Sequence, residues 1–93
     1  MVALHESSRK GNAITIGMLI QHGANKDATD DNGATPLMWA TINGKMEAVK
    51  VLLEAGAEQS IKATRNIFAR KTAREIAVEN GYQGIAALLD PRF

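Results

Sequence analysis

The sequence repeats itself, and this repeat constrains the fold more than any other feature. A shift of 33 residues superposes identical residues, namely Leu4 on Leu37, Gly11 on Gly44 and Gly23 on Gly56. A second shift of 37 residues superposes Thr35 on Thr72, Gly44 on Gly81 and Leu52 on Leu89. Periods of this length are typical of arrays in which one small structural unit is copied and stacked. The longer second shift indicates four extra residues between Gly56 and Thr72.

Each copy predicts two short helices. In the middle copy Thr35 is suited to cap a helix, and Pro36 takes the first helical position, where its missing N–H costs nothing. This helix is expected to end at Asn43-Gly44, because glycine accepts the left-handed conformation of a helix C-terminus. A second helix is predicted over residues 46–55, with its apolar residues along one face. Helices this short are unstable alone, so neighbouring pairs must stack.

The middle copy resembles an ankyrin repeat, on the motif Gly33-Ala34-Thr35-Pro36-Leu37-Met38-Trp39-Ala40, then Asn43-Gly44, then Val49-x-Val51-Leu52-Leu53-x-x-Gly56-Ala57. The resemblance covers essentially the whole chain. It implies an all-α solenoid of stacked helix-turn-helix pairs joined by β-hairpin-like loops. Two departures are Met38, where the family usually has histidine, and Arg74, where leucine is usual. His5 stands at the family's histidine position, which implies a hydrogen bond linking a hairpin to a helix.

One ankyrin-repeat domain is expected over residues 1–93, because a chain of 93 residues has room for only one. We place a partial repeat 1, which lacks its leading hairpin, at 1–29. Repeat 2 is placed at 30–62, and repeat 3, with its lengthened loop, at 63–93.

The resemblance implies a protein–protein interaction module, a scaffold or adaptor that binds through a concave face and loop fingers and has no catalytic residues. Its partner-binding residues would lie at a first finger (residues 29–34, the short finger) and at one end of the following helix. These residues are Thr29, Asp31, Asn32 and Ala34 on the short finger, and Ile42 and Asn43 on the helix. Ordinary turn chemistry is the alternative for Asp31 and Asn32. Local packing is the alternative for Ile42.

The insertion coincides with a basic window. Residues 59–74 hold five basic residues and no acid, in a chain of net charge +1. Within this window we define residues 62–71 as the long finger. We expect it to dock on an acidic, partly hydrophobic surface of a protein partner, through Arg65, Asn66, Ile67, Phe68, Arg70 and Lys71. The alternative is a solvated loop whose Ile67 and Phe68 fold back onto the third repeat.

Different binding roles are conceivable for the basic window, the terminal repeats and the sole tryptophan. The basic window could bind nucleic acid, although the rest of the chain is acidic and Phe68 would be its single stacking ring. The terminal repeats could pair into a homodimer if they expose apolar ends. Trp39, the sole tryptophan, could be a binding hot spot, but a core position between stacked helices is favoured.

Several function classes lack their residues. The chain has no cysteine, and His5 and His22 are too far apart in sequence to make a convincing metal pair. No phosphate-binding loop, nucleophile elbow or metalloprotease motif is present. We therefore expect no enzyme, no cofactor and no metal. Since neither a signal peptide nor a long apolar run is evident, we expect an intracellular protein, cytoplasmic or nuclear, without a membrane partner.

Overall fold

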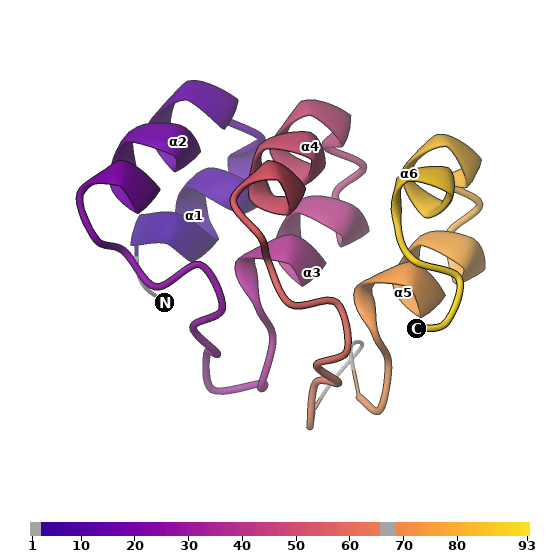
Figure 1. Cartoon of the computed structure of the whole chain (residues 1–93). Helices are drawn as coiled ribbons and strands as arrows, with labels where there is room; N and C mark the ends of the chain where they lie inside the picture. Colours follow the sequence, from indigo (N-terminus) through magenta and orange to yellow (C-terminus); the bar gives the residue numbers. More distant parts are fainter. Residues whose placement is uncertain (1–2, 66–68) are drawn as a thin grey trace.

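The computed structural model of the chain describes residues 3–65 and 69–93. In these two ranges the chain forms pairs of antiparallel helices, which are α1 (Ala3–Lys10), α2 (Ala13–Gln21), α3 (Pro36–Ile42), α4 (Met46–Glu54), α5 (Ala73–Glu79) and α6 (Gln83–Leu88). Figure 1 shows α1, α3 and α5 in one layer and α2, α4 and α6 in a second, with the loops extending from the first layer. The expected all-α stack of helix pairs is confirmed.

Side chains cap the first helices where the sequence predicts. The Thr35 hydroxyl accepts a hydrogen bond from Met38 N at 3.3 Å. Thr72 does the same for Glu75 N at 3.3 Å. The Glu75 carboxylate in turn accepts from Thr72 N at 3.0 Å, which completes a capping box. These bonds satisfy amide groups that have no partner inside the helix.

We expect Thr72→Ala to lower the free energy of unfolding by about 1–2 kcal/mol, the usual loss of an N-cap side chain. The hydroxyl also donates to the carbonyl oxygen of Phe93 at 2.7 Å, so the change releases the C-terminal residue from α5 as well. Urea denaturation followed by circular dichroism measures the loss. Thr29→Ala is the matched control, because Thr29 is exposed in a loop. Equal stability of the two variants would contradict the role given to Thr72.

Neighbouring repeats contact each other where first helices end. Gly44 has a φ of +67° and follows α3. A Cβ atom there would lie 3.3 Å from the Tyr82 ring. Gly11 ends α1 in the same way, and a Cβ atom on it would lie 2.7 Å from Lys45. In each case a side chain of the following repeat lies over the glycine, and the left-handed backbone at both positions favours glycine.

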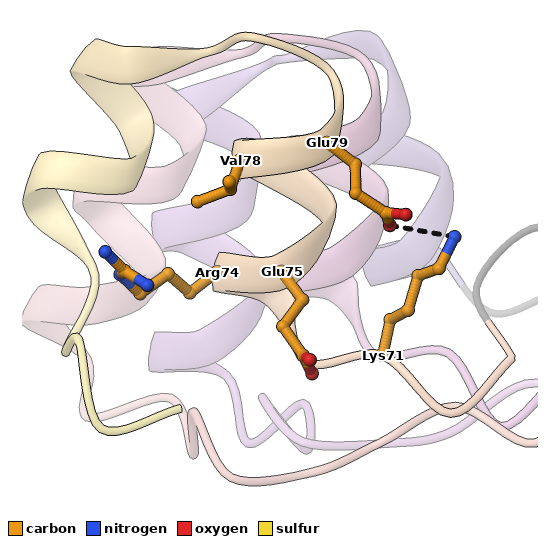
Figure 2. Close-up of a pocket in the computed structure, with 5 residues that line it drawn as sticks. All are labelled: Lys71, Arg74, Glu75, Val78 and Glu79. Carbon is orange, nitrogen blue, oxygen red and sulfur yellow. Dashed lines mark ion pairs between the residues drawn. The ribbon is translucent and has the colours of Figure 1, made fainter.

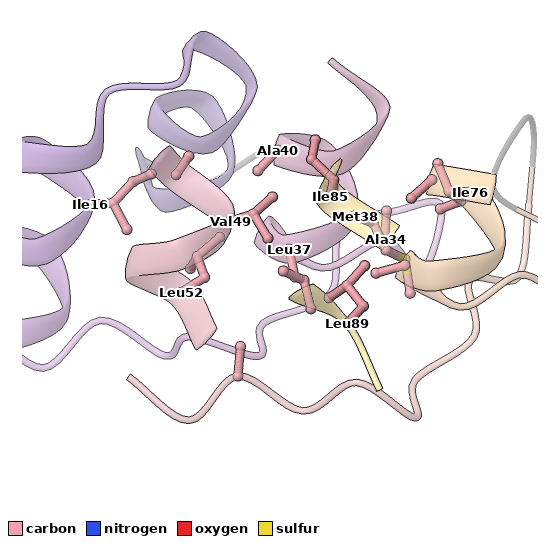
Figure 3. Packing of buried hydrophobic residues seen from close by; sticks show 14 of the residues in the cluster. Ile16, Ala34, Leu37, Met38, Ala40, Val49, Leu52, Ile76, Ile85 and Leu89 are labelled. Carbon is pink, nitrogen blue, oxygen red and sulfur yellow. The ribbon is translucent and has the colours of Figure 1, made fainter. Parts of the chain in front are cut away.

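The core runs through the stack without interruption (Figure 3). Leu52 of α4 and Leu89, which follows α6, are equivalent in the repeat, and both are almost completely buried. Ser8 and Thr41 also occupy equivalent buried positions. Their hydroxyls each donate to the carbonyl four residues earlier, at 2.7 Å. These bonds explain how polar residues are tolerated between stacked first helices.

The predicted structural role of His5 is confirmed. Its side chain is buried, and its Nε2 lies 3.0 Å from the carbonyl oxygen of Ala34. This contact ties α1 to the loop that precedes α3. The equivalent residue in repeat 2 is Met38, whose side chain is buried in the core and has no N–H or O–H group to make such a tie.

Candidate functional site

The long finger is closed at its base by the backbone. Arg70 N donates to the carbonyl oxygen of Ala63 at 2.8 Å, and Ala63 N donates to that of Lys71 at 3.3 Å. Ala63 is buried in the core, so the base of the finger is anchored in the stack. Arg70 adopts a φ of +62°, an uncommon conformation for a residue with a side chain. The long finger is therefore closed by two backbone hydrogen bonds shortly before the chain enters α5.

The two fingers are joined to each other. Asn32 of the short finger offers its carbonyl oxygen to Thr64 N at 2.9 Å and to Arg65 N at 3.1 Å. The Thr64 hydroxyl donates to the same oxygen at 3.2 Å. Gly33, with a φ of +72°, permits this approach, because a Cβ atom would lie 2.7 Å from the Thr64 hydroxyl oxygen. The structure thus brings together Asn32 and Arg65, which the sequence places on different fingers.

Asp30 holds the short finger in shape. One carboxylate oxygen accepts from Asn32 N at 2.9 Å and from Ala34 N at 3.0 Å. The other accepts from Trp39 Nε1 at 2.7 Å, which links the finger to α3. Burial of the carboxylate raises the pKa of Asp30, but hydrogen bonds from Trp39, Ala34 and Asn32, together with nearby His5, outweigh that effect and leave its pKa below the ordinary value. Asp30 is therefore held as a charged acceptor.

A small hollow lies beside Asp30. It measures about 220 Å³ and is lined by Asp30, Asp31, Asn32 and Trp39. Trp39 is half-buried and packs against the core. Its ring is therefore both part of the stack, as predicted, and part of the wall of this hollow.

The predicted partner-binding residues differ in exposure. The exposed ones are Thr29, Asp31, Asn43, Arg65 and Arg70. Half-buried positions are Asn32, Ile42 and Lys71, and Ala34 is fully buried. The side chain of Ala34 therefore supports the short finger from inside. Asn66, Ile67 and Phe68 lie outside the described residues.

The cations of the long finger have different surroundings. Lys71 Nζ lies 2.8 Å from a carboxylate oxygen of Glu79 (Figure 2). The backbone N–H of Thr72 has the largest part in lowering the pKa of Glu75, and the charges of Lys62 and Lys71 add to it. Arg65 and Arg70 are exposed, and neither forms an ion pair within residues 3–65 and 69–93. Both guanidinium groups are therefore accessible to an external carboxylate.

The outward face of α5 combines charged side chains with an exposed valine. Lys71, Arg74, Glu75, Val78 and Glu79 line a hollow of about 340 Å³ there (Figure 2). In repeat 2 the positions equivalent to Arg74 and Glu75 are the buried Leu37 and Met38. Arg74, which stands where leucine is usual in the family, is half-buried on this face. The face borders the long finger through Lys71.

Asp30 is the residue of the candidate site that the sequence did not indicate. The signal was present, since an aspartate often accepts a hydrogen bond from the N–H two residues later, here Asn32. The adjacent Asp31-Asn32-Gly33 predicts only the turn itself. The bond to Trp39, nine residues away, carries no local signature and could not be read from the turn.

Comparisons with known proteins agree on one family. A family model described as ankyrin repeats in three copies matches residues 4–92. The NAD-capped RNA hydrolase NUDT12 of Homo sapiens is 38% identical over 86 residues, which are 91% of this chain and 18% of that protein. The calmodulin-binding transcription activator CBT of Oryza sativa subsp. japonica is 36% identical over 89 residues, 94% of this chain and 10% of that protein.

The ankyrin repeat domain-containing protein oryK of Aspergillus oryzae (strain ATCC 42149 / RIB 40) is 30% identical over 88 residues, 95% of this chain and 13% of that protein. The chain thus spans less than a fifth of the length of each of these three relatives. None of the helices in the described ranges has the length and apolar character that a membrane crossing requires.

Proposed function

Since the chain belongs to the ankyrin repeat family, we propose that it binds a partner protein through the concave side of its stack, formed by the first helices and the two fingers. Ankyrin repeats are generally protein-interaction modules. Stacked repeats create extended concave surfaces suited to this role. The relatives named as a hydrolase and a transcription activator are matched over only 18% and 10% of their lengths, so their activities are not attributed to this chain.

The main support for the proposal is that hydrogen bonds join the two fingers. Three hydrogen bonds from Thr64 and Arg65 converge on the carbonyl oxygen of Asn32. A surface that is held in shape before binding loses less conformational entropy when the partner arrives. Arg65 and Arg70 stand exposed on this joined unit, without an ion pair among the described residues.

The partner's contact surface would be acidic. Arg65 and Arg70 present planar guanidinium groups, which bind carboxylates through paired hydrogen bonds. Asp31 on the short finger and Asn43 after α3 are exposed and would supply further polar contacts. The half-buried Ile42 would offer an apolar contact beside Asn43. Contacts through Asn66, Ile67 and Phe68 stay a prediction from the sequence.

We expect Arg65→Glu and Arg70→Glu each to weaken partner binding by at least about tenfold, because a cation facing carboxylates becomes an anion. The partner is first captured from lysate with the wild-type chain. Affinity is then measured by calorimetry at low and at physiological salt. The wild-type affinity should fall as salt rises, since exposed charge pairs are screened.

Lys50→Glu is the matched control, because it makes the same type of charge change on the exposed side of α4, in the other helix layer. It should leave affinity within about twofold, because charges separated by more than a Debye length are largely screened. If both finger variants bind as tightly as the wild type, the long finger does not contact the partner. Circular dichroism confirms that each variant is folded.

A further inference from the structure

The outer side of α2 carries an exposed apolar surface. Ile14 is 79% exposed and Met18 is 55% exposed. Together with Ala13, Gly17 and Gln21 of α2 and Val51 of α4, they line a shallow hollow of about 370 Å³, which we name the α2 outer face. Large apolar side chains gathered on a surface are a typical mark of an interaction site.

The repeat itself shows that the fold does not require this surface to be apolar. A shift of 33 residues places Ile14 on Glu47 and Gly17 on Lys50 of α4. In α4 these two residues form an ion pair at 3.5 Å and are exposed to solvent. The same structural position is therefore charged in repeat 2 and apolar in repeat 1, so packing within the stack cannot explain Ile14.

Gly17 gives a second, independent indication. It lies in the middle of α2, where glycine costs helix stability relative to alanine. A Cβ atom on Gly17 would have nothing within 4 Å, so no contact inside the chain requires its absence. A glycine at the centre of an exposed apolar face would allow another backbone to come close.

We propose that the α2 outer face binds the same face of a second copy of this chain, with the two α2 helices crossing at Gly17. In a two-fold dimer each residue of the patch meets the same patch of the other copy, so a charged patch would repel itself. The helix from Ala13 to Gln21 contains no charged residue. The neighbouring helix α4 contributes Val51 to the hollow and also carries the exposed Glu47 and Lys50, one charge of each sign, so a two-fold axis can set opposite charges of the two copies against each other.

This surface is distinct from the proposed partner site. In Figure 1 the α2 helix lies in the layer away from the fingers, and the loops extend from the other layer. The sequence suggested a homodimer through the terminal repeats, and the proposed contact lies on one helix, α2, of repeat 1. The patch is small, so the dimer is expected to be weak and to depend on protein concentration. Partner binding at the fingers does not depend on it.

Sedimentation equilibrium of the full chain over a range of concentrations tests the proposal. The average mass of the wild type should rise toward that of a dimer as concentration increases. Ile14→Glu gives α2 the residue type that α4 has at the equivalent position, Glu47. It should weaken dimerisation by at least about tenfold, because the glutamates of the two copies would both be buried against apolar surface. Val78→Glu is the matched control, since Val78 is 54% exposed on α5, and it should dimerise as the wild type does.

A second variant tests the crossing point. Gly17→Leu adds bulk where the chain itself has open space, so the monomer should be at least as stable to heat as the wild type, while the dimer is lost. Circular dichroism melts check folding of every variant. The proposal is overturned if the wild type remains monomeric at about 1 mM, a concentration at which even a weak complex is populated. It is equally overturned if Ile14→Glu or Gly17→Leu dimerises like the wild type.

Discussion

Replacing Leu52 by alanine is expected to lower the free energy of unfolding by about 3–4 kcal/mol, the largest effect of any single side-chain truncation we consider. Leu52 lies in α4 and is completely buried. Its equivalents in the first and third repeats are Leu19 and Leu89. Truncation removes apolar contacts and leaves a cavity that short, mutually supported helices can fill only in part.

A domain of this size has about 5–15 kcal/mol of stability in total, so the loss removes a large share of it. Urea denaturation followed by circular dichroism measures the change. Leu88→Ala in α6 is the matched control, because Leu88 is substantially exposed, and it should cost less than about 1 kcal/mol. A similar loss from both variants would contradict the view that stacked helix pairs share one continuous core.

Replacing Asp30 by alanine is expected to lower the free energy of unfolding by about 2–4 kcal/mol and to loosen the short finger. The change leaves the N–H groups of Asn32, Ala34 and Trp39 without their carboxylate acceptor. Hydrogen bonds to a charged acceptor are stronger than neutral ones, and unpaired donors in a half-buried place are costly. Asp30→Asn keeps the size and one acceptor oxygen, so its loss should be smaller.

Trp39→Phe is the control that distinguishes the bond between the short finger and α3 from the bonds inside the finger. It removes the indole N–H and leaves the bonds from Asn32 and Ala34 to Asp30. We expect it to cost less than Asp30→Ala. Hydrogen exchange measures the second effect, as the amides of Asn32 and Ala34 should lose protection in Asp30→Ala and keep it in Trp39→Phe. Unchanged protection in Asp30→Ala would show that Asp30 does not hold the short finger.

We expect the Asp30 carboxylate to make the free energy of unfolding depend on pH in the acid range. The pKa of Asp30 in the folded chain lies below its ordinary value, so the unfolded chain binds the proton more readily. The ionised Asp30 carboxylate therefore adds to the free energy of unfolding at pH values above its pKa in the unfolded chain, which is about 4. This contribution is lost as the pH falls through the lower pKa that Asp30 has in the folded chain. Hydrogen bonds from Arg92 lower the pKa of Asp90 to about 2. The stabilisation by ionised Asp90 is therefore also lost as the pH falls.

The difference between wild type and Asp30→Asn isolates the contribution of Asp30. This difference in unfolding free energy should shrink as the pH is lowered from about 6 towards the folded pKa. Denaturant titrations at several pH values measure it. A difference that stays constant over this range would mean that ionisation of Asp30 does not stabilise the fold.

Much of the fold could be predicted because its determinants are local and repeated. Thr35 and Thr72 cap helices as expected, and α3 runs from Pro36 to Ile42. The second helix predicted over 46–55 is found at Met46–Glu54. The structural role of His5 also followed from its place in the repeat. A cap or a turn depends on neighbours a few residues away, and the same pattern recurs along the chain.

The candidate site was predicted only in outline. The sequence placed Asn32 and Arg65 on separate fingers, whereas the structure bonds one finger to the other through the Asn32 carbonyl oxygen. It left Trp39 as either core or contact residue, whereas the ring packs on the core and also donates to Asp30. The first result depends on backbone atoms far apart in sequence, and the second on a side chain reaching across a turn. Neither leaves a periodic signal.

The sequence alone therefore determined the helix pairs, their caps and their stacking, because periodic apolar residues and turn residues act within one repeat and recur in the next. Only the tertiary structure decided which polar groups meet between loops, and which apolar residues stay outside. Ile14 and Leu52 are similar in hydrophobicity and both lie on second helices. One is exposed and the other buried because stacking covers one face of each helix and leaves the outer face free.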